Sequence, residues 1–170
     1  NAALLCGAVI DFVDVDQHGH MCVVELERKL KIAEKIGKLP KVVTPVHFAG
    51  LPCNMIQIHN LSKQYGFRIV EDASHAIGSE YETGRTGSCK YSDICVFSFH
   101  PVKIITSGEG GLATTNCAKL HEKMLLLRSH GITRDMKKFN SKKIEDSWYY
   151  EQQELGFNYR MTDIHAALAL

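Results

Sequence analysis

The segment richest in residues that could carry chemistry is 98–111, which reads SFHPVKIITSGEGG. A single lysine, Lys103, follows a β-rich run that ends at Ser98, and a glycine-rich stretch comes after it. A lysine amine attacks carbonyl groups when burial or nearby positive charge lowers its pKa toward neutrality. The Ser98 hydroxyl, beside free backbone N–H groups, can hold a phosphate. A lone lysine is more often a solvated residue on a turn, so only its neighbours favour the chemical interpretation.

A second candidate segment covers residues 70–78, VEDASHAIG. Asp72 ends a predicted strand, and a carboxylate at a strand end can pair with a ring nitrogen of a cofactor. The alternative is that Asp72 caps a following helix. His75 lies three residues further on and either faces the same site or is a hydrogen-bonded core histidine.

A third polar cluster precedes the last predicted helix, in ELGFNYRMTDIHAAL at residues 154–168. Asn158 begins this cluster, Arg160 offers a planar fork for phosphate or carboxylate, and Thr162 can cap the helix. The alternative is a capped turn on the surface. Four residues are candidates for the substrate side, although each is more often structural: His47, His130, Tyr159 and Arg160.

The elements that must position these residues alternate along the chain. Strands are predicted over residues 8–14, 41–46, 68–72, 94–98 and 112–115. Helices are predicted over 24–36, from a cap at Asn54 to a stop at Gly66, over 118–129 and over 161–170. Residues 137–154 show no clean period and are predicted to form a loop or insert. This order indicates an α/β fold with a mostly parallel sheet, whose ligands lie beyond the carboxyl ends of the strands.

The composition excludes several classes of protein. The 170 residues carry a net charge of +1, and no basic run predicts a nucleic-acid partner. Apolar stretches are far shorter than the roughly 20 residues of a membrane span. None of the six cysteines forms a C-x-x-C pair, so no zinc or other metal site is predicted, and their scattered spacing favours the reduced thiols of a cytoplasmic protein.

These motifs, in this order, resemble the DegT/DnrJ/EryC1/StrS sugar aminotransferases. The resemblance rests on EDASHAIG, SFHPVKIITSGEGG, LRSHGI and LGFNYRMTDIHAAL, and it covers nearly the whole chain except an insert at residues 137–150. It implies part of the large pyridoxal-phosphate-binding domain of a fold-type I transferase, similar to aspartate aminotransferase. Both chain ends fall inside helical patterns, so we expect residues 1–170 to lack an N-terminal segment and a C-terminal small domain.

The resemblance also implies roles for five residues. Lys103 matches the lysine that carries pyridoxal 5'-phosphate as a Schiff base, and Asp72 matches the acid that pairs with the pyridine nitrogen. His75 matches a position near the ring hydroxyl, and Ser98 matches a serine that holds the phosphate. Asn158 matches an asparagine that reaches the phosphate of the neighbouring subunit, which implies a homodimer.

The implied reaction moves an amino group from glutamate to the 4-keto carbon of a UDP-linked deoxy-sugar, as in the pseudaminic acid branch of the family. Two alternatives remain open. The chain could be a catalytically inactive relic or regulatory fragment of the same fold. It could also be another α/β binding module, but no G-x-G-x-x-G or Walker pattern is present.

Overall fold

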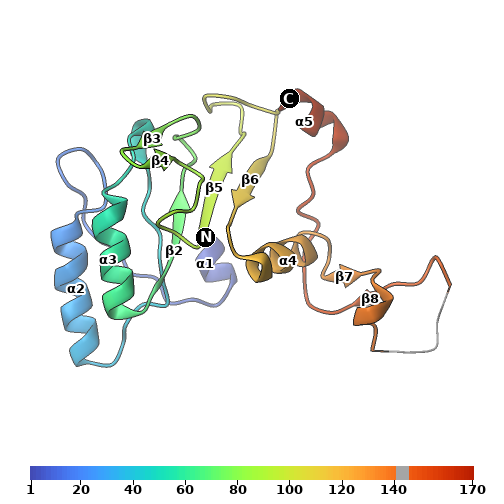
Figure 1. Cartoon of the computed structure of the whole chain (residues 1–170), viewed down its shortest axis with the longest axis horizontal. Coiled ribbons are helices and arrows are strands. Elements are labelled where there is room, and N and C mark those ends of the chain that lie inside the picture. Colours follow the sequence, from blue (N-terminus) through green and yellow to red (C-terminus); the bar gives the residue numbers. More distant parts are fainter. Residues whose placement is uncertain (141–145) are drawn as a thin grey trace.

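A four-stranded sheet forms the centre of the chain, whose computed structural model describes residues 1–140 and 146–170. The strands lie in the order β1 (Val42–Val43), β2 (Arg68–Asp72), β5 (Ile94–Ser98), β6 (Gly111–Thr114). β1, β2 and β5 are parallel, whereas β6 pairs antiparallel with β5, so both ends of the loop that joins them lie at the carboxyl edge of the sheet (Figure 1). This confirms the mostly parallel α/β architecture that the sequence predicts.

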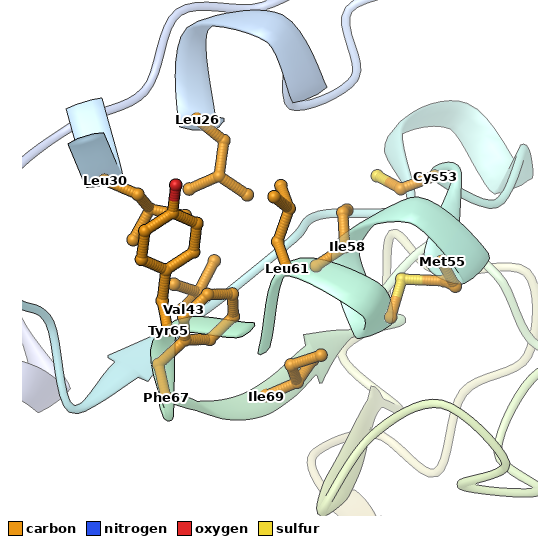
Figure 2. Close-up of a cluster of buried hydrophobic side chains, with 10 residues drawn as sticks. All are labelled: Leu26, Leu30, Val43, Cys53, Met55, Ile58, Leu61, Tyr65, Phe67 and Ile69. Carbon is orange, nitrogen blue, oxygen red and sulfur yellow. The ribbon is translucent and has the colours of Figure 1, made fainter. Parts of the chain in front are cut away.

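Two helices, α2 (Val23–Lys35) and α3 (Met55–Tyr65), lie side by side next to the sheet (Figure 1). The predicted ends of α3 are confirmed, because the Asn54 side chain accepts a hydrogen bond from the Gln57 N–H and Gly66 adopts a left-handed conformation. The apolar sides of α2 and α3 meet β1 and β2 in one buried cluster (Figure 2). Ile58 and Ile69 lie at its centre and are at most 1% exposed.

The two faces of the sheet differ in how well they are covered. Side chains alternate along a strand, and Ile69 and Glu71 of β2 lie on the buried face toward α3. On the opposite face, Val42 of β1 is 50% exposed and Val96 of β5 is 37% exposed. Parallel strands normally carry cover on both faces, so this second face is the less protected one.

One predicted strand is wrong. Residues 8–14 form no strand, and Val9 is fully exposed while Phe12 is 77% exposed. The apolar and β-branched composition of this segment favours a strand, but a strand exists only where another strand accepts its backbone hydrogen bonds. Nearby, only a single bridge from Val15 to Met21 forms, after the short helix α1 (Ala2–Leu5).

The remaining elements lie beyond the sheet in sequence. A hairpin of β3 (Glu80–Tyr81) and β4 (Gly84–Arg85) precedes β5, and α4 (Ala118–Leu127) follows β6. Within the predicted loop, the structure has η2 (Met136–Lys138) and β8 (Glu151–Gln152), which pairs with β7 (Ile132–Thr133). Residues 141–145 of the predicted insert lie outside the described residues.

The last helix, α5 (Asp163–Leu168), begins as predicted at Thr162, whose hydroxyl accepts a hydrogen bond from the His165 N–H. A three-residue turn, η1 (Phe48–Gly50), follows β1. Within residues 1–140 and 146–170, every helix is too short or too polar to cross a membrane.

The cysteines should differ sharply in reactivity. Burial raises the pKa of the Cys53 thiol to about 11, and burial also raises the pKa of Cys95, whereas Cys6 and Cys117 are exposed. At pH 8 a thiol with a pKa near 11 is thiolate in only about one molecule per thousand. We therefore expect iodoacetamide to label Cys6 and Cys117 in the native protein before Cys53 and Cys95, as measured by peptide mass spectrometry. Equal rates for Cys53 and Cys117 before denaturant is added would contradict this prediction.

Candidate active site

Asp72 and Ser98 lie on the same face of the sheet, at its carboxyl edge. Asp72 is the last residue of β2 and stands opposite Val96 of β5. Ser98 is two residues further along β5, which places it on the side of Val96 and about 6.6 Å further along the strand. Both residues are half-buried and belong to the less protected face. The two sequence candidates are thus brought to one edge by strand register alone.

Lys103 lies in the loop between β5 and β6, which closes at that same edge. The loop is held at its base, because Ser98 pairs with Gly111 and the Phe99 N–H donates to the Gly110 carbonyl at 2.9 Å. A turn then forms as the Lys103 N–H donates to the His100 carbonyl. Lys103 is half-buried, and its amine makes no ion pair or side-chain hydrogen bond with any residue that the structure describes.

The glycines of this loop serve close packing within the chain. A Cβ atom on Gly110 would lie 2.6 Å from the Ser107 Oγ and 2.5 Å from the Met161 Cε. Ser107 is fully buried and donates its hydroxyl to the Glu109 carbonyl. The GEGG stretch therefore permits the tight backbone that the sequence predicts, and it fixes the return path of the Lys103 loop against residue 161.

Asp72 has one carboxylate oxygen engaged and one available. Its Oδ1 accepts hydrogen bonds from the Ser74 N–H at 3.0 Å and from the Ser74 Oγ at 2.5 Å. The next element after Asp72 is the strand β3, so the Asp72 carboxylate holds this turn and does not cap a helix. Among the described residues, no hydrogen bond is made to Oδ2. A carboxylate with one oxygen held and the other available suits a fixed partner for a ring nitrogen.

His75 follows on the turn after β2 and is half-buried. Its ring lies against Phe48, with the ring centroids 5.9 Å apart and the planes tilted by 58°. Phe48 belongs to η1, so the turn after β1 and the turn after β2 meet at the edge that carries Asp72. A contact between the His75 ring and a cofactor stays a prediction.

A fully buried carboxylate next to Asp72 was missed by sequence reasoning. Glu71 is fully buried, and its carboxylate accepts hydrogen bonds from His47, Tyr81 and Ser92. His47, proposed above for the substrate side, is fully buried and belongs to this network instead. The one sequence signal for Glu71 is its position in RIVED, two residues after Ile69 and so on the same face of the strand.

Asn158 lies in a different part of the chain. Its backbone bridges to Ser129 after α4, its side chain is exposed, and no described contact joins it to Asp72, Ser98 or Lys103. Exposed His130 also lies there, where its N–H donates to the Phe157 carbonyl. The structure does not bring Asn158 to the site within one chain.

The neighbours of Asn158 do approach the Lys103 loop. Tyr159, Arg160 and His165 line an open hollow of about 300 Å³ together with Glu109, Gly110, Gly111 and Met161. Tyr159 and Arg160 are exposed. Two candidates for the substrate side thus border the returning strand of the lysine loop.

These residues fit the pyridoxal phosphate that the sequence resemblance implies. Lys103 offers an amine without a protein partner among the described residues, and Asp72 offers an available carboxylate oxygen. The Ser98 hydroxyl is free to donate because, among the residues that the structure describes, its Oγ only accepts, from the His100 N–H at 3.3 Å. An amine, a carboxylate and a hydroxyl donor at one edge match the three polar ends of that cofactor.

Comparison with known proteins identifies relatives along the whole chain. Residues 1–170 match the profile of the DegT/DnrJ/EryC1/StrS aminotransferase family. The sequence is 41% identical over 171 residues to a UDP-4-amino-4,6-dideoxy-N-acetyl-beta-L-altrosamine transaminase of Campylobacter jejuni, and this covers 100% of the chain and 41% of the relative. The chain thus spans about two fifths of the length of the curated relatives that it matches.

Solved structures show the same relation. Helicobacter pylori PseC, an aminotransferase involved in the biosynthesis of pseudoaminic acid, matches with a TM-score of 0.81 and 32% identity, over 97% of this chain and 40% of its own. The PLP-form of the putative sugar aminotransferase Spr1654 from Streptococcus pneumoniae matches with a TM-score of 0.76 and 29% identity, over 98% of this chain and 43% of its own. Both likenesses confirm the fold-type I transferase architecture expected from the sequence.

Proposed function

The chain belongs to the DegT/DnrJ/EryC1/StrS aminotransferase family, and on that premise we propose that its full-length protein is a pyridoxal-phosphate-dependent sugar aminotransferase. It transfers an amino group from glutamate to the 4-keto carbon of a UDP-linked deoxy-sugar. The observation that carries the proposal is the Lys103 amine, unpartnered among the described residues, on a loop that closes at the sheet edge of Asp72 and Ser98. The relative from Campylobacter jejuni supports the UDP-sugar substrate.

Each side chain at the edge has a distinct task in this proposal. Lys103 would hold the cofactor through Nζ and would serve as the acid and base that moves a proton at the substrate carbon. Asp72 would hold a proton on the ring nitrogen through Oδ2, Ser98 would donate its hydroxyl to the phosphate, and His75 would lie near the ring hydroxyl. When bound, the cofactor supplies an electron sink that stabilises a carbanion.

The proposed assembly is a homodimer in which Asn158 reaches the phosphate of the partner subunit. Its exposed side chain and its separation from Asp72 within the chain are what such a role requires. We also propose that residues 1–170 are one part of the large domain in a cytoplasmic protein. Exposed Val42 and Val96 on the second face of the sheet, and relatives of more than twice this length, support further cover from the rest of the protein.

The proposal is tested by reducing the full-length protein with borohydride in the presence of pyridoxal phosphate. We expect a reduced cofactor adduct on the peptide that contains Lys103, identified by mass spectrometry, and a 4-amino product when glutamate and a UDP-4-keto-sugar are added. A protein that forms no adduct would instead be the catalytically inactive relic considered above. An adduct without amino transfer to the sugar would support the proposed cofactor and contradict the proposed sugar substrate.

A further inference from the structure

A second carboxylate, Glu71, stands directly before Asp72 on β2 and faces the opposite side of the sheet. It is fully buried, and three donors from separate segments surround it: His47 after β1, Tyr81 of β3 and Ser92 before β5. These four residues form the Glu71 network. The network links the segment after β1, the hairpin strand β3 and the segment before β5 to the strand that ends in Asp72.

The orientation of the His47 ring in the network is fixed from both sides. The Cys53 N–H donates to the His47 Nδ1 at 3.2 Å, so Nδ1 is an acceptor and the ring proton is on Nε2. Nε2 lies 2.7 Å from the Glu71 Oε2 and therefore donates to it. The same tautomer satisfies both contacts, and the ring cannot turn over without losing both.

The backbone of His47 is bonded to Asp72 itself. The His47 N–H donates to the Asp72 carbonyl at 3.0 Å, and the Asp72 N–H donates to the Pro45 carbonyl at 2.9 Å. One residue therefore binds the Glu71 side chain through its ring and the Asp72 main chain through its amide. A movement of His47 therefore acts directly on the Asp72 backbone, because the two are joined by a hydrogen bond.

Stability alone does not account for a carboxylate at this position. Burying a charge carries a desolvation cost, and well-packed apolar residues of similar volume are often neutral or stabilising in its place. The buried face of β2 otherwise carries Ile69, and the neighbouring strand carries Cys95 opposite Glu71. Apolar residues in place of the whole Glu71 network would suit these surroundings, so packing alone does not explain why a carboxylate stands here.

We propose that Glu71 is a positioning residue for Asp72, acting through His47. The inference rests on the proposed function, because it assigns Asp72 to the ring nitrogen of the cofactor. The Glu71 network holds the Pro45–His47 backbone against the end of β2, and Ser74 holds the Asp72 Oδ1. With main chain and one oxygen both fixed, Oδ2 has a single direction in which to meet the ring nitrogen.

The test compares Glu71→Gln with Thr86→Val in the full-length protein. Glutamine keeps the size of the side chain but removes the charge that three donors share. Thr86 is also buried and polar, but its hydroxyl bonds to Ser79 at 2.8 Å, outside the network, so it is a matched control. If Glu71→Gln does not fold, Tyr81→Phe removes one donor and leaves the charge in place.

Two readouts separate positioning from general stability. In the protein without cofactor, we expect amide hydrogen exchange at His47 and Asp72 to accelerate roughly tenfold in Glu71→Gln, as loss of a hydrogen bond to a charged group would give. In the loaded protein, the ¹⁵N shift of a ring-labelled cofactor should move toward the unprotonated value, and cofactor affinity should fall about tenfold. Thr86→Val should change neither readout.

A Glu71→Gln protein that melts earlier but keeps wild-type exchange at His47 and Asp72, and a wild-type ¹⁵N shift, would overturn the proposal and leave the network structural. Failure of the proposed function is distinguishable, because a wild-type protein that binds no cofactor fails before any variant is compared. The exchange experiment on unloaded protein would then still decide whether Glu71 holds Asp72.

Discussion

Replacing Lys103 with alanine should abolish the borohydride-trapped adduct and lower kcat/KM by on the order of 10⁴-fold or more, since one residue supplies both the covalent attachment and the proton transfer. The physical reason is local. Lys103 is half-buried and is the single lysine of segment 98–111, so no other amine on that loop can assume its role. The measurement is single-turnover amino transfer, with adduct mass recorded in parallel.

The control for Lys103 is Lys119→Ala, which removes an exposed lysine of α4 and should leave both readouts unchanged. Lys103→Arg keeps the charge and should be as inactive as the alanine variant, because a guanidinium does not lose its proton in proteins. Addition of a small amine such as methylamine should restore a measurable part of the rate in Lys103→Ala. Activity of Lys103→Ala within tenfold of wild type would refute the assignment.

Asp72→Asn should retain the Lys103 adduct but lower kcat by roughly 10²–10³-fold, as removal of one preorganised electrostatic partner does in other enzymes. Asparagine can still accept the Ser74 hydrogen bonds through its amide oxygen, so the turn after β2 should persist. What disappears is the negative charge that holds a proton on the ring nitrogen. The measurements are the adduct mass, kcat and KM for the sugar.

Ser74→Ala is the graded companion to Asp72→Asn. It removes the hydroxyl from Oδ1 but leaves the charge and the Ser74 N–H in place, so we expect only a loss of about three- to tenfold in kcat. We expect kcat to be lowest in Asp72→Asn, intermediate in Ser74→Ala and highest in wild type, and this order tests the assigned contacts of Asp72. If Asp72→Asn kept kcat within threefold of wild type, Asp72 would not be the partner of the ring nitrogen.

The parts of the fold predicted correctly depend on local chemistry. Helix α3 begins at Asn54 and ends at Gly66, and α5 begins at Thr162, as expected. These ends could be predicted because capping involves only a few neighbouring residues. The strand predicted over residues 8–14 failed because a strand requires a partner, which composition cannot supply. At the site, the residue types within segment 98–111 name Lys103 and Ser98 as candidates, and their roles stay predictions.

The sequence could not reveal which residues each polar side chain contacts. His47 was a reasonable candidate for the substrate side, but it proved to be fully buried against a residue 24 positions away. Glu71 passed unnoticed because its partners come from three separate segments. Whether Asn158 acts across a dimer remains a prediction, since one chain cannot contain both halves of such a site.

Glu71 and Asp72, a longer and a shorter carboxylate at consecutive positions of β2, also disfavour a sheet in which β2 is shifted in register. A slip of β2 by one residue would turn every side chain to the other face, so Asp72 would enter the buried side of the sheet and Glu71 would leave it. Aspartate is one methylene shorter and could not reach His47, Tyr81 and Ser92 together. A buried carboxylate left with unmade bonds costs several kcal/mol. The order Glu-Asp, unlike Asp-Glu, therefore lets only the correct alignment of β2 satisfy both faces.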